Sequence, residues 1–209
     1  MRIFMSANET QRKELETIKV NDSNELVFNS GLPGNEEYKN YDAYFIFSAS
    51  WHSLDFTHFG TKPVFINAVT ETLSQLNLPA NVSRLNAWPG FLQKKVWEIA
   101  SSDQKNIKDI FNIINRDFIV VKDEPGLVAA RVISMIINEA FFAVGEKVST
   151  KEEIDLAMKA GTNYPLGPFE WAEKIGVNNI YHLLKKLSEK DNRYAVAPAL
   201  ENNFQMNHK

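Results

Sequence analysis

The stretch KDEPGLVAAR, residues 122–131, separates two sequence patterns and thereby decides the fold. Before it, short apolar runs alternate with loops. After it, no strand-like run remains and each segment carries helix boundary signals. We therefore predict a boundary between residues 1–122 and 123–209. Pro125 suits the first turn of a helix, where its missing N–H costs nothing, and we expect Ala129 and Ala130 in that turn, exposed.

Residues 1–122 are predicted to alternate strands with helices. The strand-like runs are rich in Phe, Val and Ile and bounded by Asn, Asp, Gly or Pro; they read RIFM, ELVF, DAYFIFSA, KPVFIN and DFIVVKD. Unbroken runs such as AYFIF favour strands covered on both faces, hence a mainly parallel sheet. Helical composition occurs in ETQRKELETI and SDQKNIKDIFNII. The pattern indicates the α/β class.

Residues 123–209 are predicted to be all-α. The segment up to Val148 is apolar on nearly every side, so we expect it to be buried all round, partly against a second copy of the chain. The chain is therefore predicted to form a homodimer through these helices. The polar tail after Lys190 is expected to pack loosely.

The later helices have explicit boundary residues. Thr150 and Glu153 have the spacing of a capping box, with Gly161 predicted to end that helix. Pro168 is predicted to open the next helix and Gly176 to follow its end. A third helix is predicted in NNIYHLLKKLSEK, which has one apolar stripe.

Composition excludes several classes of function. The formal net charge is −3, from 23 basic and 26 acidic residues, so no basic field favours nucleic acid. The absence of cysteine excludes disulfides and thiolate catalysis and fits a reducing compartment, hence a cytoplasmic location. The polar start lacks the apolar core of a signal peptide. No apolar stretch approaches the ~20 residues needed to span a bilayer, so we expect a soluble protein with no membrane partner.

Few residues point to chemistry by themselves. Gly31 and Gly34 follow the second predicted strand rather than the first, so we interpret them as a surface turn instead of a phosphate loop. The histidines lack zinc-site spacing, and no metal is expected. His52 and His58 follow a strand and are either a catalytic base or ordinary surface residues. His182 and His208 are interpreted as structural or solvent-exposed.

From Asp123 to about Leu184 the sequence closely resembles the C-terminal domain of the 3-hydroxyacyl-CoA dehydrogenase family. The resemblance is carried, in the family's order, by KDEPGLVAARV, INEAFFAV and STKEEIDLAMKAGTNYPLGPFEWAEKIG. It implies a helical dimerisation domain that follows an NAD-binding, Rossmann-like domain. It also implies that a protein with these two domains acts on a 3-hydroxyacyl thioester of coenzyme A. Residues 1–122 resemble a shortened, degenerate form of that nucleotide domain, without the dinucleotide fingerprint.

The resemblance also implies positions for the catalytic pair. The family has a His–Glu pair, with the Glu twelve residues after the His. Glu98 matches the acid, and Asn86 stands where the His is expected. Each residue has a second interpretation: Glu98 as a solvent-facing residue of an edge strand, and Asn86 as a turn residue before WPG.

Three further positions follow from the resemblance. Asn67 matches a family Asn, but Val69 stands where the family has a Ser that binds the substrate oxygen, with Thr70 beside it. Ala130 stands where the family has an Asn at the helix entry. We therefore place the substrate-binding positions at Asn67, Thr70 and Ala130.

Three hypotheses about function remain open. The first is a catalytically degenerate family member, a dimeric scaffold or acyl-CoA-type ligand binder that needs no cofactor. The second is an active NAD-dependent 3-hydroxyacyl-CoA or 3-hydroxybutyryl-CoA dehydrogenase, an oxidoreductase of fatty-acid metabolism, in which His52 or His58 replaces the lost base. The third is a purely structural partner that binds no small molecule.

Overall fold

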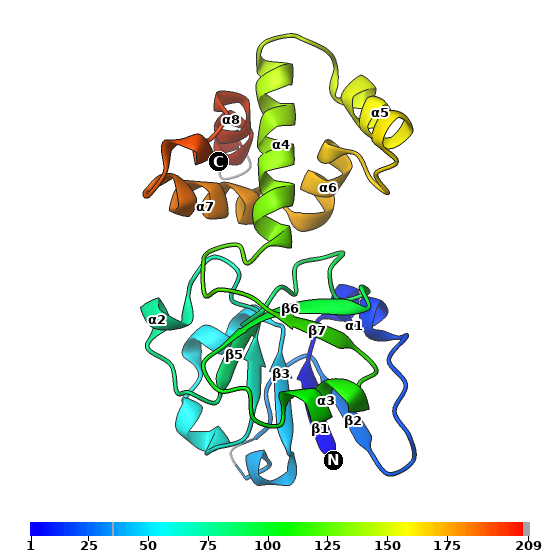
Figure 1. The fold of residues 1–209 in the computed structure, drawn as a ribbon, viewed down its shortest axis with the longest axis vertical. Coiled ribbons are helices and arrows are strands. Elements are labelled where there is room, and N and C mark those ends of the chain that lie inside the picture. The colour runs from blue at the N-terminus through cyan, green and yellow to red at the C-terminus, as the bar shows by residue number, and fades with distance from the viewer. Residues whose placement is uncertain (35, 207–209) are drawn as a thin grey trace. The chain divides into compact units, whose positions relative to one another are not determined.

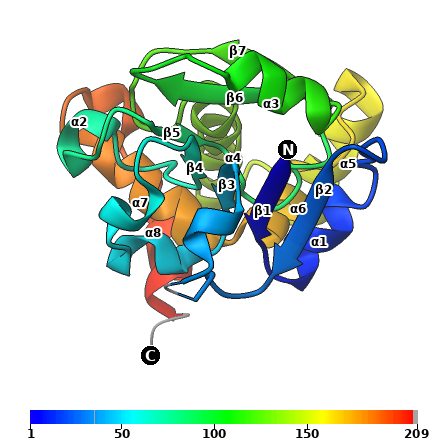
Figure 2. The same ribbon diagram turned by 90° about the horizontal axis from the view of Figure 1, so that it is seen from below.

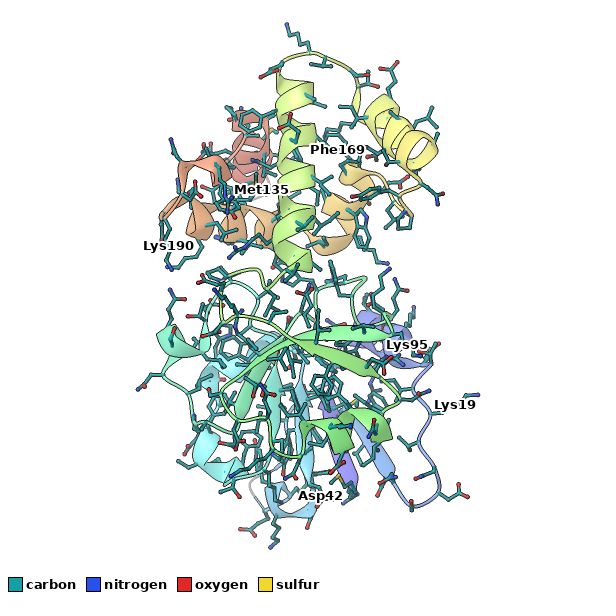
Figure 3. The ribbon with its side chains drawn as sticks, viewed as in Figure 1. Lys19, Asp42, Lys95, Met135, Phe169 and Lys190 are labelled. Atoms are coloured by element: carbon teal, nitrogen blue, oxygen red, sulfur yellow. The ribbon has the colours of Figure 1, made fainter. Side chains whose placement is uncertain are left out.

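The computed structural model describes residues 1–34 and 36–206, which form two compact units, Met1–Leu127 and Val128–Lys209 (Figure 1). His208 lies outside the described residues. Charged side chains such as Lys19, Lys95 and Lys190 project from the surface (Figure 3). Each unit has its own core and is described by itself.

The first unit is built on a seven-stranded sheet in the order β2-β1-β3-β4-β5-β6-β7 (Figure 2). The strands are β1 Arg2–Ser6, β2 Glu25–Asn29, β3 Ala43–Ile46, β4 Val64–Ile66, β5 Val82–Leu85, β6 Val96–Ser101 and β7 Asp117–Val120. Strands β1 to β5 are mutually parallel, β6 runs antiparallel to β5, and β7 is parallel to β6. The predicted mainly parallel, Rossmann-like sheet is confirmed.

Both faces of the sheet are covered, as the unbroken apolar runs predicted. On one face, Phe45 and Phe65 pack with Leu15 of α1 (Glu9–Leu15) and Phe111 of α3 (Ile107–Ile113). On the other face, the buried residues of β3 and β4 pack against short 3₁₀ segments: η1 (Tyr38–Asn40), η2 (Ala49–Ser53) and η3 (Phe56–Phe59). A four-residue helix, α2 (Leu73–Leu76), follows β4.

Strand β5 is an addition to the predicted set, and β6 was predicted only through the edge-strand interpretation of Glu98. Their sequences, VSRL and VWEIAS, contain polar residues, yet Ser83 and Arg84 are fully or almost fully buried. Ser83 bonds to Ser101 of β6, Oγ to Oγ, at 2.8 Å. A buried strand with satisfied polar side chains lacks the apolar run by which strands are predicted.

The second unit is helical, with α6, α7 and α8 packed around α4 (Figure 1). Its helices are α4 Ala129–Gly145, α5 Lys151–Thr162, α6 Pro168–Ile175, α7 Val177–Ser188 and α8 Pro198–Met206, with the 3₁₀ segment η4 at Asn192–Tyr194. The apolar stripe of α7 is buried. The predicted all-α class is confirmed.

Most predicted boundaries of α5, α6 and α7 hold, with one correction. Thr150 and Glu153 form the capping box of α5, and Pro168 opens α6, which Gly176 follows. Gly161 lies inside α5 and does not end it. The terminating residue is Asn163, in the left-handed conformation at φ 56°, because Asn tolerates that region better than most residues with a Cβ.

The start of α4 also differs from prediction. Pro125 precedes the helix, which begins at Ala129. Gly126 at φ 82° and Leu127 at φ 49° are left-handed and interrupt helical geometry. The amide of Gly126 donates to the carbonyl of Val69 at 2.7 Å, so this turn is bonded to the first unit. Ala130 is fully buried rather than exposed, and α4 packs against several helices of its unit.

The boundary between the units falls after Leu127, five residues beyond the predicted one after residue 122. Asp123 and Glu124 both accept hydrogen bonds from Arg84 of β5, which binds the segment to the first unit. Hydrogen bonding rather than composition therefore sets the boundary.

The tail is also better packed than predicted. α8 contacts α4 and α7, and its Leu200 is fully buried. No described helix has both the length and the apolar character that crossing a bilayer requires.

Candidate functional site

The carboxyl ends of the parallel strands meet at one edge of the sheet in the first unit. The strand order reverses at β1, which lies between β2 and β3. Open α/β sheets bind ligands outside the carboxyl ends of the strands at such a reversal. We call this the carboxyl edge; it contains Ser6, Phe47, Asn67 and Asn86, at or just after the ends of β1, β3, β4 and β5.

Asn67 connects two neighbouring strand ends across its own strand. Its Nδ2 donates to the carbonyl of Phe47 at 3.4 Å, and its Oδ1 accepts from the amide of Ala87 at 3.0 Å. Its backbone carbonyl accepts from the indole of Trp51 at 3.1 Å. Both ends of the side-chain amide are thus hydrogen-bonded to backbone groups, one after β3 and one after β5. The amide connects these strand ends at the carboxyl edge.

Asn86 has one satisfied and one unsatisfied end. Its Oδ1 accepts from the amide of Trp88 at 3.1 Å, which is the turn role predicted from the WPG motif. Its Nδ2 is buried and has no hydrogen-bond partner within the part of the chain that the structure describes. Because the bonded Oδ1 fixes which end is which, the unsatisfied group is a donor.

Glu98 lies in an interior strand, β6, between β5 and β7; the edge-strand interpretation is wrong. The antiparallel register pairs Arg84 with Ala100 and Leu85 with Ile99. Continuing it by one residue puts Asn86 opposite Glu98, where Cβ atoms of paired residues are about 5 Å apart and share a face. Asn86 thus follows directly on the last residue pair of the β5–β6 ladder, and Glu98 precedes it on β6.

Val69 and Thr70 follow β4. Val69 is buried, and its carbonyl accepts from the amide of Gly126 at 2.7 Å, while Thr70 is half-buried. The fully buried Arg84 reinforces this segment, since its Nη1 donates to the carbonyl of Ala68 at 3.1 Å.

Arg84 also forms an ion pair that sequence reasoning missed. Its Nε donates to Oδ1 of Asp123 at 2.6 Å. Asp123 accepts from the amides of Leu73 and Ser74 at 3.0 and 3.2 Å, at the start of α2. Burial raises the pKa of the Asp123 carboxyl, but these donors outweigh it and leave the pKa below its usual value. The carboxylate therefore stays charged.

The start of α1 supplies further residues that sequence reasoning missed. Asn8 caps the helix and forms a capping box with Gln11. Gln11 is buried, and its Nε2 donates to the carbonyls of Phe47 and Ala87 at 3.1 and 3.4 Å. The Asn-x-x-Gln spacing predicts a capping box, but nothing local reveals the bonds to two other strands.

The loop after Asn86 is held by a carboxylate of α1. Glu14 accepts from the amides of Gly90 and Leu92 at 2.5 and 3.1 Å. The indole of Trp97 donates to the carbonyl of Leu92 at 3.2 Å. The position of Asn86 is thus fixed by α1 on one side and β6 on the other.

The two candidate histidines of this unit lie in different places. The ring of His52 stacks on Trp51 at 3.7 Å, and Trp51 bonds to Asn67 at the carboxyl edge. The ring of His58 stacks on Tyr38 at 5.3 Å. Tyr38 precedes β3, so it lies toward the amino ends of the strands. Only His52 is near the candidate site.

Ala130 belongs to the second unit, where it is fully buried in α4. It has a methyl group where the resemblance implies an amide. His182, on α7, is exposed and packs edge-on against Phe204 at 5.3 Å, which fits its structural interpretation.

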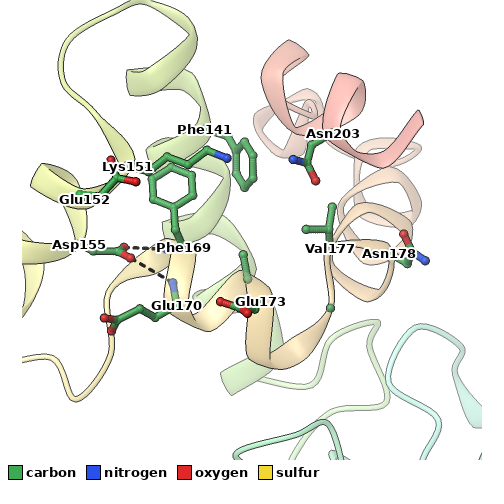
Figure 4. Close-up of a pocket in the computed structure, with 12 residues that line it drawn as sticks. Phe141, Lys151, Glu152, Asp155, Phe169, Glu170, Glu173, Val177, Asn178 and Asn203 are labelled. Atoms are coloured by element: carbon green, nitrogen blue, oxygen red, sulfur yellow. Dashed lines mark hydrogen bonds between the residues drawn. The ribbon is translucent and has the colours of Figure 1, made fainter. Parts of the chain in front are cut away.

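The second unit contains a cavity of about 560 Å³. The ammonium of Lys151 lies over the rings of Phe141 and Phe169, at 5.9 and 5.5 Å (Figure 4). Asp155 accepts from the amides of Phe169 and Glu170 at 2.8 and 3.2 Å, so it caps α6. These contacts hold helices together, and we assign the cavity no chemistry. Within residues 1–34 and 36–206, no three His, Cys, Asp or Glu residues group as metal ligands.

Comparison with known proteins gives a family match for the second unit. The family model described as "3-hydroxyacyl-CoA dehydrogenase, C-terminal domain" matches residues 126–209. The chain is 42% identical over 67 residues to the 3-hydroxyadipyl-CoA dehydrogenase of Escherichia coli (strain K12), covering 32% of this chain and 14% of the relative. It is 29% identical over 141 residues to the 3-hydroxybutyryl-CoA dehydrogenase of Clostridioides difficile, covering 64% and 50%. The matches thus span at most half the length of these curated relatives.

A solved structure extends the likeness in fold to both units. The (S)-3-hydroxybutyryl-CoA dehydrogenase of Ralstonia eutropha superposes with a TM-score of 0.71 at 16% identity, covering 96% of this chain and 92% of that one. At this identity the likeness concerns the fold alone.

Proposed function

Because the chain belongs to the 3-hydroxyacyl-CoA dehydrogenase family through residues 126–209, we propose that it is a catalytically degenerate member of that family. Its role is that of a dimeric scaffold that binds an acyl-CoA-type ligand without performing dehydrogenase chemistry. The relatives are named as dehydrogenases of 3-hydroxyadipyl-CoA and 3-hydroxybutyryl-CoA, which suggests the ligand class.

The observation that carries the proposal is the pairing of Asn86 with Glu98. The antiparallel register of β5 and β6, continued by one residue, supports a neighbourhood of these two residues such as the resemblance implies for a His–Glu pair. An amide does not accept a proton at neutral pH, and general-base catalysis contributes roughly 100- to 10,000-fold. In addition, the Oδ1 of Asn86 is already bonded to Trp88. The residue is therefore suited to donating a hydrogen bond and not to abstracting a proton.

Two further positions support the same conclusion. Val69 offers no side-chain donor where a Ser is expected, and Ala130 offers none where an Asn is expected. Asn67 is present, but its amide is bonded to strand ends. An oxyanion or substrate oxygen would thus lose donors that commonly contribute about 10²- to 10³-fold each.

The alternative is an active NAD-dependent dehydrogenase of 3-hydroxyacyl-CoA esters. One observation favours it: His52 stacks on Trp51, which bonds to Asn67 at the carboxyl edge. A base in that position would replace the one missing at Asn86. His58 has no comparable place, because it packs against Tyr38 toward the amino ends of the strands.

The test is a thermal-shift titration of the purified chain with acetoacetyl-CoA, with free coenzyme A as the matched control. We expect acetoacetyl-CoA to raise Tm, because binding at ~100 times Kd stabilises by about 2.7 kcal/mol. The same protein should not oxidise 3-hydroxybutyryl-CoA with NAD. Turnover that His52→Ala abolishes and His58→Ala leaves intact would establish the alternative. No shift with any CoA ester would instead favour a scaffold that binds no small molecule.

We also propose that the second unit forms a homodimer. Apolar side chains remain exposed in the single chain, including Val132 of α4 at 53% and Leu156 of α5 at 63%. Exposed apolar groups of this size on a small helical unit favour self-association.

The net charge of −3 argues against nucleic acid as a partner. A chain without cysteine is compatible with a reducing compartment, and we propose a cytoplasmic location, with no membrane partner.

A further inference from the structure

The turn from β1 into α1 is where a sheet of this kind receives a dinucleotide. Three glycines at spacing i, i+2, i+5 normally serve it. The first makes the tight turn, the second lets the backbone approach the pyrophosphate, and the third allows close helix–strand packing. Counted from the last residue of β1, these positions are Ser6, Asn8 and Gln11. All three have side chains.

The first two side chains are engaged within the turn. Ser6 is fully buried, and its hydroxyl bonds to that of Ser48 at 2.9 Å, connecting the ends of β1 and β3. Oδ1 of Asn8 accepts from the amide of Gln11 at 2.9 Å, while the amide of Asn8 donates to Oε1 of Gln11 at 3.1 Å. Amides that would face a pyrophosphate are therefore satisfied internally.

Gln11 extends across the reversal point of the sheet. Its Nε2 donates to the carbonyl of Phe47, after β3, and to that of Ala87, after β5. The side chain is 5% exposed. At the position where the third glycine would allow close helix–strand packing, the Gln11 amide instead bonds α1 to two strand ends. The side chain of Asn67 is hydrogen-bonded to the backbone of the same two residues, Phe47 and Ala87.

The end of β2 also departs from a dinucleotide site. Such sites have an acidic residue about 20 residues after the glycines, which binds a ribose hydroxyl. The residue at the end of β2 is Asn29, whose Oδ1 accepts from the amide of Gly31 at 3.1 Å. The carboxylate is missing, and the amide oxygen has an internal partner.

We infer that the carboxyl edge does not take a dinucleotide, because the Gln11 side chain occupies its place as an internal cross-link. The fold implies NAD, but the residues present do not fit it. The side chain of Gln11 accepts a hydrogen bond from the Asn8 amide at the start of α1. It also donates to the backbone after β3 and after β5, so it connects three segments that a bound cofactor would otherwise bridge. The inference does not depend on the proposed acyl-CoA ligand, because it concerns the β1–α1 turn alone.

The test compares Gln11→Ala with Gln75→Ala. Gln75 forms the same kind of capping box, with Thr72 of α2, but none of its hydrogen bonds joins two strands. We expect Gln11→Ala to lower Tm by about 5 °C or more and Gln75→Ala by less than half of that. The wild-type chain should give no NADH fluorescence enhancement and no Tm shift up to about 1 mM NADH.

Two results would overturn the inference: saturable NADH binding by the wild-type chain, or equal Tm losses for the two variants. If Gln11→Ala does not fold, Gln11→Glu replaces it. That variant keeps an acceptor for the Asn8 amide but removes the donor to both carbonyls, so a Tm equal to wild type would also contradict the cross-link. Acetoacetyl-CoA is titrated separately, so its failure to bind would count against the proposed ligand only.

Discussion

The ion pair of Arg84 with Asp123 makes stability depend on acid pH. The pKa of Asp123 is below its usual value in the folded chain, whereas an unfolded Asp has a pKa of about 3.9. A group whose folded pKa is depressed stabilises the fold above the unfolded pKa and loses this contribution as pH falls through the folded pKa. We expect the free energy of unfolding to fall more steeply below about pH 4 in the wild type than in Asp123→Asn.

Urea unfolding between about pH 7 and about pH 2.5 measures this difference. Asp109→Asn, which changes an exposed carboxylate on α3, should keep the wild-type slope. If Asp123→Asn also kept it, the ion pair would not be the acid-sensitive group.

Ser134 offers the opposite case, a buried polar group that contributes no bond. Its side chain is fully buried in α4, and its hydroxyl has no partner among the described residues. We expect Ser134→Ala to stabilise the chain by up to about 1 kcal/mol, because Ala removes the unsatisfied group and favours helix. Ser188→Ala is the control, since that hydroxyl donates to the carbonyl of Lys185 at 2.8 Å. A loss of stability in Ser134→Ala, measured by urea unfolding, would point to a bond that the hydroxyl does make.

At this scale the sequence was a partial guide to the site. The turn role of Asn86 could be predicted, because the WPG motif is local, whereas its neighbourhood with Glu98 stays a prediction from the family spacing. Gln11 could not be assigned its role, because its partners lie 36 and 76 residues away. A residue within a predicted helix gives no local sign of the strand ends to which its side chain will be hydrogen-bonded.

Between elements, α5 is joined to α6 through a capping carboxylate. Asp155 of α5 accepts from two amides at the start of α6, and Gly167 lies directly against it. A Cβ at Gly167 would overlap the Asp155 side chain, although φ at −72° is ordinary for any residue. We expect Gly167→Ala to destabilise the second unit by about 2 kcal/mol or more.

Gly161→Ala is the matched control for that change. A Cβ at Gly161 meets nothing within 4 Å, and the residue lies inside α5, so Ala should stabilise by about 1 kcal/mol. If thermal denaturation shows that Gly167→Ala lowers stability and Gly161→Ala raises it, the contact of Gly167 with Asp155 is supported. Equal changes in stability for the two variants would contradict it.

The segment that leads into the last helix is hydrogen-bonded to a side chain of α4. Asn138 donates to the carbonyl of Ala195 and accepts from the amide of Ala197, both at 2.9 Å. We expect Asn138→Ala to cost about 1–3 kcal/mol, since it leaves the buried backbone amide of Ala197 unpaired. Hydrogen exchange in residues 195–206 should become faster, while Asn112→Ala, at an exposed position on α3, should leave it unchanged.

Helices with boundary residues could be predicted closely, whereas strands with polar side chains could not. Thr150 and Pro168 act through backbone groups within a few residues, so their effect is readable locally. The buried charge of Arg84 is neutralised by Asp123, 39 residues later, so nothing local marks this charged segment as a buried strand. The tail was misjudged for the same reason, because Asn138 supplies its partner from a distant helix.

For the whole molecule, the proposed homodimer makes stability depend on protein concentration. We expect Tm to fall on dilution through the micromolar range, because dissociation removes the linked stabilisation. Val132→Asp should weaken the dimer in sedimentation experiments. Val96→Asp, at a comparably exposed valine of the first unit, should not. A wild-type chain that stays monomeric at about 100 μM would remove this proposal.

The segment between the two units also determines where the polypeptide can be cut for separate expression. A piece that stops at residue 122, as composition suggests, would keep the fully buried guanidinium of Arg84 and its bond to the Ala68 carbonyl, but would discard its only ion-pair partner among the described residues, the Asp123 carboxylate, together with the Glu124 carbonyl. An orphaned interior cation costs about 3–5 kcal/mol, enough to leave such a fragment aggregated or proteolysed. A piece that runs to Leu127 retains them and the Gly126 bond to Val69, so five extra residues decide whether the fragment is usable.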